Sequence, residues 1–163
     1  MQIQIVTSTG EGKTLLSAFD NALQNAGVSN YNLIVLSSII PPQSTIVRKK
    51  SYVTPPEEFG HRLYVVRAEM RSNETGKFIA AGVGWYLLDD GRGFFVEHEL
   101  VGDTKVAVEY DIENRIRNSL SDMCAFRHIR FVKEMVQTAI AIKQVDGQPA
   151  CALAVAVYRS EPW

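Results

Sequence analysis

The chain has 163 residues, of which 46% are hydrophobic and 21% charged, and its formal net charge is −1. This length suits one domain that buries most of its apolar surface, so we expect a single domain over residues 1–163. The basic residues are scattered, with Arg48–Lys50 the densest cluster, which argues against a nucleic-acid partner. No apolar run approaches about 18 residues and no signal peptide is recognisable, so we expect no membrane contact and a cytoplasmic location.

The two cysteines, Cys124 and Cys151, lie far apart in the chain, and neither belongs to a CxxC pattern or to a cluster with histidine. Disulfide frameworks and zinc sites need closer or more numerous ligands. The sequence therefore predicts two reduced, buried thiols and no metal site.

The first 60 residues predict a strand, a helix, a second strand and a loop. Residues 2–7 alternate as a strand does, and a polar loop leads to a helix over about residues 14–26. Gly27 is placed to end that helix as a left-handed C′ residue. A second strand is expected over about residues 31–36, followed by an irregular, proline-containing loop over residues 41–60.

The rest of the chain predicts hairpin-linked strands and one long helix. The strands are expected over about residues 62–71, 77–88, 94–101, 129–143 and 150–159, and the helix over about residues 103–126. Asp103 is the predicted N-cap of this helix, and Gly147 marks the turn of the last hairpin.

This order of elements predicts an α+β fold, namely a multilayer αββα sandwich of mostly antiparallel sheets with helices on the outer faces. The last strand, residues 150–157, is apolar on both faces. Such a strand must be covered on both sides, by helices and sheets of the same chain or by a second subunit.

One stretch partly matches the sequence pattern of a phosphate-binding loop. Residues 8–14 follow a strand and precede a helix, but Thr7 stands where the motif requires its first glycine. Nucleotide binding is therefore disfavoured. His61, His98 and His128 lack the spacing of metal ligands or of a catalytic triad, and we interpret them as structural or surface residues.

A strand near residue 97 carries a candidate acid. Glu97 and Glu99 share one face of this strand and His98 takes the other. Glu97 follows the apolar run Phe94–Val96, so partial burial would raise its pKa and keep a proton available near neutral pH. A solvated strand edge explains the same pattern equally well.

The serine pair Ser37–Ser38 lies between an apolar strand and Pro41–Pro42. Serine pairs usually cap local loops with hydrogen bonds. Here the apolar neighbours and prolines favour a strained peptide bond, which a serine hydroxyl can attack to form an ester. β-Elimination would then cut the chain, and hydrolysis of the resulting dehydroalanine would leave a pyruvoyl group.

These residues resemble those of the pyruvoyl-dependent arginine decarboxylases, and the similarity extends over nearly the whole chain. It is carried by residues 18–23, 25–27, 32–34, 36–42 and 96–99 and by the C-terminal hairpin from Gly147 to Tyr158. Its most specific part runs from Asn32 through Ser38 to Pro42.

The resemblance implies cleavage between Ser37 and Ser38, which gives a β chain of residues 1–37 and an α chain of residues 38–163. The cofactor would be a covalent pyruvoyl group derived from Ser38, without metal or pyridoxal phosphate. Its carbonyl would condense with the substrate amine as a Schiff base and accept the electrons released as carbon dioxide leaves.

The resemblance also assigns roles to further residues. Asn32 would assist processing by donating to the oxyanion, Glu97 would protonate the former α-carbon, and Ser37 would contact the substrate. Asp20 would bind the guanidinium group. The family forms homotrimers of αβ protomers with active sites between neighbours, so Asp20 would serve an adjacent subunit.

The implied reaction converts L-arginine to agmatine and carbon dioxide, in polyamine biosynthesis or acid resistance. Two alternatives stay open: an unprocessed, non-catalytic trimeric relative, and a decarboxylase of another amino acid such as histidine. Lys13 and Asn21 depart from the expected surroundings of Asp20 and could weaken a preference for arginine. The identity of the substrate amino acid therefore stays open.

Overall fold

The computed structural model describes residues 1–163 and contains two α-helices, two single 3-10 turns and nine strands. The helical elements are α1 (Leu15–Ala26), η1 (Pro56–Glu58), α2 (Lys105–Phe126) and η2 (Lys133–Met135). The strands are β1 (Gln2–Glu11), β2 (Asn32–Val35), β3 (Ile39–Ile40), β4 (Thr45–Arg48), β5 (Arg62–Ser72), β6 (Phe78–Leu87), β7 (Gly93–Gly102), β8 (Gln137–Gln144) and β9 (Ala150–Glu161).

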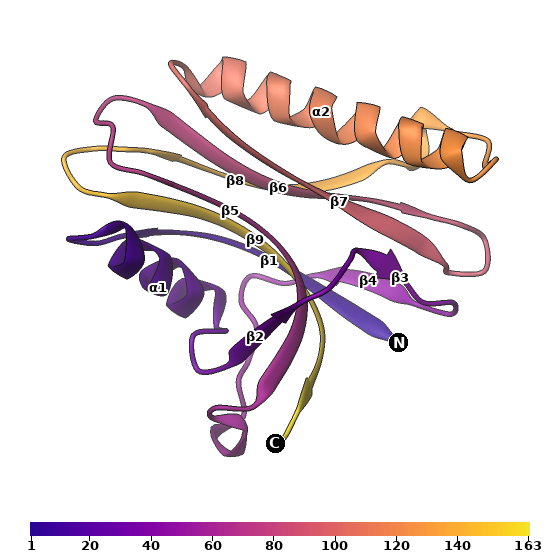
Figure 1. The fold of residues 1–163 in the computed structure, drawn as a ribbon, viewed down its shortest axis with the longest axis horizontal. Helices are drawn as coiled ribbons and strands as arrows, with labels where there is room; N and C mark the ends of the chain where they lie inside the picture. Colours follow the sequence, from indigo (N-terminus) through magenta and orange to yellow (C-terminus); the bar gives the residue numbers. More distant parts are fainter.

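The strands form two stacked sheets with one helix on each outer face (Figure 1). One sheet has the order β2-β5-β9-β1-β4 and is covered on its outer face by α1, and the other has the order β3-β7-β6-β8 and is covered on its outer face by α2. All strand pairs are antiparallel except β1 with β4 and β2 with β5. The predicted αββα sandwich is confirmed.

Helix α1 is fixed at both ends by local hydrogen bonds. Thr14 is the N-cap and forms a capping box with Ser17, and Gly27 ends the helix with a left-handed φ of 82°. The helix lies so close to β1 that a Cβ atom at Gly10 would come within 2.3 Å of the Ala18 carbonyl oxygen. Small residues on both elements therefore permit this close packing.

The last strand is covered on both faces, as its sequence predicts. Ala152, Ala154 and Ala156 belong to the core between the two sheets, while Leu153 and Val155 pack under α1. All five are fully buried. Because this cover comes from the same chain, β9 needs no second subunit to bury its apolar faces.

Helix α2 packs on the second sheet through one buried stripe, which includes Ile112, Ile116 and Leu120. Gly84 of β6 makes room for this stripe, since a Cβ there would lie 2.1 Å from Cγ2 of Ile116. The stripe fixes the rotation of α2 and so decides which of its side chains face β7.

Two predicted boundaries are wrong. The N-cap of α2 is Thr104, whose hydroxyl accepts from the Ala107 amide, while Asp103 pairs with Lys77 at 2.6 Å. The strand expected from about residue 129 begins at Gln137. Ile129, Phe131 and Val136, which precede β8, pack beside α2 and do not join a sheet. Their apolar pattern therefore indicates burial and not a strand.

The predicted irregular loop over residues 41–60 contains β4, and β1 extends through the expected polar loop as far as Glu11. Residue-level patterns do not reveal β4, because it forms by parallel pairing with β1 more than forty positions away in the chain. Neither helix contains a segment that is both long and apolar enough to cross a membrane. Cys124 and Cys151 are free and buried.

Candidate active site

Ser38 lies against the edge of β7. Strand β3 pairs with β7 only through Ile39 and Ile40, opposite Phe94 and Gly93. Just beyond this pairing, the Phe95 amide donates to the Ser38 carbonyl oxygen at 2.8 Å. The short β3 strand thus places the serine pair beside the point where β7 becomes an edge strand.

The backbone of Ser38 is strained. Its φ of 69° lies in the left-handed region, which costs a residue with a side chain about 1–2 kcal/mol. The conformation is held from both sides, by the Phe95 amide and by the Tyr158 hydroxyl, which donates to the Ile39 carbonyl oxygen at 3.0 Å. Strain that is enforced in this way is typical of functional positions.

The Ser38 hydroxyl donates a hydrogen bond to Oε1 of Glu97. Burial raises the pKa of the Glu97 carboxyl, and the hydrogen bond from Ser38 opposes this rise only in part. Burial and the nearby Glu97 carboxylate also raise the pKa of Tyr158, which keeps its hydroxyl protonated. The site thus joins a positioned hydroxyl to a carboxyl that retains its proton more readily than an exposed glutamate.

A hollow of about 450 Å³ surrounds this pair, a size suited to a small-molecule ligand. It wraps around the edge of β7 and reaches α2. Its lining consists of Ser37, Ser38, Phe95, Val96, Glu97, His98, Ser119, Asp122, Met123 and Phe126.

His98 and Ser119 were not predicted to belong to the site. Nε2 of His98 lies 2.8 Å from Oγ of Ser119, and burial together with Arg115 lowers the pKa of the imidazole, so His98 is neutral near pH 7. Strand alternation correctly places His98 and Glu97 on different faces of β7. Glu97 shares its face with Phe95, which packs between the sheets, and His98 shares its face with Val96, which packs against α2. The contact with α2 joins residues 21 positions apart, which no local pattern indicates.

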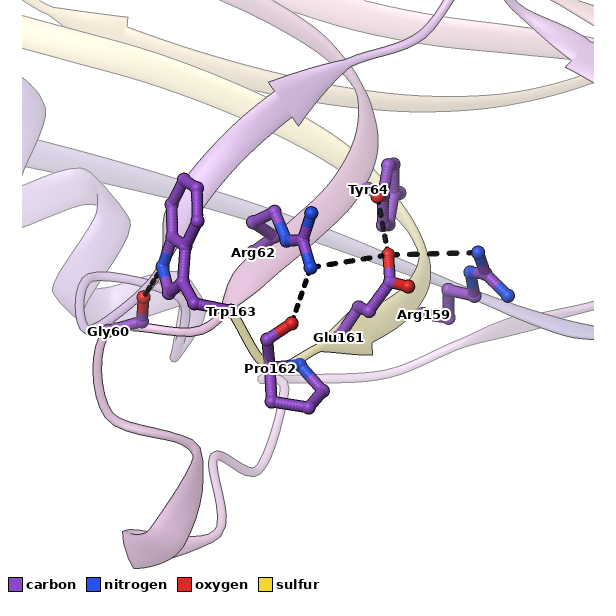
Figure 2. A network of polar contacts seen from close by, with 7 residues as sticks. All are labelled: Gly60, Arg62, Tyr64, Arg159, Glu161, Pro162 and Trp163. Atoms are coloured by element: carbon purple, nitrogen blue, oxygen red, sulfur yellow. Dashed lines mark hydrogen bonds and ion pairs between the residues drawn. The ribbon is translucent and has the colours of Figure 1, made fainter.

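Asn32 does not lie with Ser38 in this protomer. Its side-chain amide is exposed and donates to the Gly60 carbonyl oxygen at 2.7 Å. The same oxygen accepts from the indole of Trp163 at 2.9 Å, and Arg62 stacks on that indole (Figure 2). The carboxamide of Asn32 is therefore engaged with the network around the C-terminal residues.

Asp20 also lies away from the hollow. It is exposed on α1, which covers the outer face of the five-stranded sheet, whereas Ser38 and Glu97 lie in the hollow bordered by α2. Figure 1 shows the two helices on opposite sides of the molecule. Neighbouring Asn21 accepts a hydrogen bond from the Glu11 amide at 3.1 Å. The structure therefore brings together Ser37, Ser38 and Glu97, but neither Asp20 nor Asn32.

The fold and this site define an αββα protein whose candidate chemistry rests on one strained serine and one buried carboxyl at a sheet edge. The chain belongs to the pyruvoyl-dependent arginine decarboxylase family, whose sequence profile matches residues 2–162. The resemblance inferred from the sequence is thus confirmed.

Three relatives, each described as a pyruvoyl-dependent arginine decarboxylase, illustrate the similarity. The protein of Picrophilus torridus is 33% identical over 106 residues, which cover 64% of this chain and 58% of the relative. Those of Thermococcus kodakarensis and Methanococcus vannielii are 32% and 30% identical and are covered over 91% and 87% of their length, in each case by 94% of this chain. The matched region thus spans less than two thirds of some relatives and most of others.

Proposed function

We propose that this protein is a decarboxylase that converts L-arginine to agmatine and carbon dioxide, after it has cut its own chain between Ser37 and Ser38. The observation that carries the proposal is the pairing of a left-handed backbone at Ser38 with a hydroxyl that is hydrogen-bonded to Glu97. Family membership supports the reaction type, and the names of the relatives support arginine as substrate.

The cleavage step uses the Ser38 hydroxyl. Oγ attacks the carbonyl carbon of Ser37, so that an ester replaces the amide and the nitrogen of residue 38 becomes an amine. Elimination then removes the Cα proton of residue 38, whose bonding electrons form the Cα=Cβ double bond, and breaks the bond between Oγ and Cβ. This releases Ser37 as a carboxylate and leaves dehydroalanine at position 38. Addition of water expels ammonia and leaves a pyruvoyl group at the new N-terminus.

The structure favours this step in two ways. The hydrogen bonds from Phe95 and Tyr158 hold the backbone on both sides of residue 38, and Glu97 fixes the direction of Oγ. Opening the peptide bond would release the left-handed strain at Ser38. Asn32 is proposed to assist by donating to the oxyanion, which requires its amide to leave Gly60 or to act on another copy of the chain.

The residues around position 38 fit a covalent pyruvoyl group, because Ser38 supplies its carbon atoms and Phe95, Glu97 and Tyr158 adjoin it. When present, such a group supplies an electron sink for decarboxylation. Glu97 holds a proton next to residue 38 and is the proposed donor to the former α-carbon. Phe95 and Tyr158, which are both buried, limit the access of water.

A homotrimer is part of the proposal. Asp20 can contribute to a site only from a neighbouring copy, since α1 and the Ser38 hollow lie on different sides of one protomer. Apolar side chains near the serine pair remain exposed, including Val35 at 55% and Ile39 at 52%, and such side chains are candidates for a subunit contact. We place this assembly in the cytoplasm, where buried free thiols stay reduced.

The decisive measurement is the intact mass of the denatured protein, together with release of carbon dioxide from carboxyl-labelled arginine. We expect fragments of 37 and 126 residues, counted from the 163-residue chain. The larger fragment should have a blocked N-terminus that reacts with hydrazine, and Ser38→Ala should stay uncut. A full-length chain without carbon dioxide release would identify a non-catalytic relative, and release from histidine but not arginine would overturn the substrate.

A further inference from the structure

A second hollow of about 450 Å³ lies beside the segment that follows Ser38. This volume lies within the range of small-molecule sites. The second hollow shares no lining residue with the hollow of the candidate active site. Its walls come from three parts of the chain, namely Ile39–Pro42, the β6–β7 connection with Leu88 and Arg92–Phe94, and the end of α2 with Arg127 and Ile129.

Strained backbone holds two of these walls. Only three residues other than glycine have a positive φ, namely Ser38 at 69°, Gln43 at 58° and His128 at 56°. Ser38 and Gln43 flank the wall Ile39–Pro42, and His128 lies in the wall that follows α2. The Gln43 amide donates to the Asp90 carbonyl oxygen at 2.8 Å, which fixes the far end of the first wall. Strained residues persist where their surroundings enforce them, as they do at ligand sites.

The charges that line the second hollow are of one sign. Arg92 and Arg127 are its only charged lining residues, and the rest of the lining consists of aliphatic side chains, two prolines, one glycine and the Phe94 ring. Both arginines are exposed, whereas Ile40 and Phe94 are buried. The positive charge therefore lies at the mouth and the apolar surface at the floor, an arrangement that suits an anion with an apolar body.

Both guanidinium groups are held in place and keep free N–H donors. Cζ of Arg127 lies 5.1 Å from the centroid of the Phe94 ring, and its Nη1 donates to the Met123 carbonyl oxygen at 3.1 Å. Arg127 takes part in none of the eight ion pairs of the structure. Arg92 uses its Nε for Asp90 at 2.6 Å, which leaves both of its terminal nitrogens. A guanidinium with free donors matches the two oxygens of a carboxylate.

We propose that the second hollow binds an organic carboxylate, whose apolar body packs on Phe94 and Ile129 and whose charged group pairs with Arg127. Arg92 assists, but Asp90 already neutralises part of its charge. Arginine itself is a poor ligand for this site, because the two guanidinium groups at the mouth repel the cationic end of its side chain. The site is therefore separate from the proposed decarboxylation, and its test measures binding alone.

The test is a calorimetric titration of octanoate into the wild-type protein, with acetate and octylammonium as comparison ligands. We expect octanoate to bind. Acetate should not bind because it lacks the apolar body, and octylammonium should not bind because its charge has the same sign as that of the arginines.

Arginine variants identify the group that pairs with the carboxylate. Arg127→Met should weaken octanoate binding at least about tenfold, which equals about 1.4 kcal/mol. Arg92→Met should weaken it about two- to fivefold, as expected for a partly neutralised, exposed charge. The matched control is Arg115→Met, which removes the same charge from an exposed position of α2 outside both hollows and should bind octanoate as the wild type does.

Methyl NMR supplies the location. With labelled isoleucine methyl groups, octanoate should shift the signals of Ile39, Ile40 and Ile129, which line the second hollow. It should leave unchanged the signal of Ile79, which pairs with Val101 near the other end of β7.

Four results would overturn the proposal. They are a wild-type protein that binds no octanoate at millimolar concentrations, equal affinities for octanoate and octylammonium, equal octanoate affinities of the Arg127→Met and Arg115→Met variants, and methyl shifts confined to isoleucines outside the second hollow.

Discussion

Strain at Ser38 can be measured by comparing Ser38→Gly with Ser38→Ala. Both variants lack the nucleophile and the hydrogen bond to Glu97, so both should stay full length and differ only in what they cost at a φ of 69°. An alanine in the left-handed region costs about 1–2 kcal/mol, whereas glycine adopts it freely. Glycine also gives the unfolded chain more conformational freedom, which lowers the stability of the Ser38→Gly variant by about 0.4–1 kcal/mol.

We therefore expect Ser38→Gly to be more stable than Ser38→Ala by about 1 kcal/mol. For a chain of this length the difference corresponds to about 2–4 °C in Tm. The assay is urea denaturation followed by circular dichroism, at equal protein concentrations because any assembly makes stability concentration-dependent.

The neighbouring serine supplies a control of opposite sign. Ser37 has no positive φ, so in the Ser38→Ala background a glycine at position 37 should be less stable than an alanine by about 0.4–1 kcal/mol. If Ser38→Ala equals or exceeds Ser38→Gly in stability, the backbone at residue 38 stores no strain and the physical basis of the cleavage proposal is lost.

Three further predictions concern the acid and the core. Glu97→Gln should cleave normally, because the amide oxygen still accepts the Ser38 hydroxyl, but its decarboxylation rate should fall about 10²–10⁴-fold; full activity would remove Glu97 from the acid role. The fold favours the protonated carboxyl of Glu97, whose pKa is raised by burial. In the Ser38→Ala background, the protein with Glu97 should therefore lose stability relative to its Glu97→Gln derivative as pH rises from the unfolded pKa of the glutamate through its raised folded pKa. A difference in unfolding free energy that stays constant in urea titrations between pH 4 and 8 would contradict this. Gly84→Ala should cost about 1–3 kcal/mol through its clash with Ile116. Gly82→Ala should cost less because the nearest atoms to a Cβ there are side-chain atoms at 3.0 Å or more; equal losses in thermal unfolding would argue against rigid packing of α2.

Features that depend on near neighbours in the chain could be predicted from the sequence. The end of α1 at Gly27 follows from the left-handed freedom of glycine, and the opposite faces of Glu97 and His98 follow from strand alternation. The burial that raises the pKa of Glu97 was one of two equal interpretations of its apolar neighbours, and the structure supports it.

Features that depend on distant segments could not be predicted. Strand β4 exists because β1 offers it a parallel partner, and Asp122 belongs to the hollow because α2 crosses β7 at one particular rotation. The predicted N-cap of α2 is wrong by one residue because Asp103 and Thr104 both have capping side chains. In the structure Thr104 accepts from the Ala107 amide, whereas Asp103 pairs with the distant Lys77. Neither Asn32 nor Asp20 lines the hollow at Ser38. The role proposed for Asp20 therefore requires a neighbouring copy of the chain, and the role proposed for Asn32 requires either such a copy or release of its amide from Gly60.

The position of β1 determines what a break after Ser37 would do to the folded protein. Strand β1 lies inside the five-stranded sheet, paired with β9 from Gln4 to Glu11 and with β4 on its other side. A chain cut after Ser37 would therefore behave as a split protein whose two fragments stay associated through the strand pairing of β1, without a covalent link. They would co-elute under native conditions, and the shorter piece would be an obligate complement of the longer one.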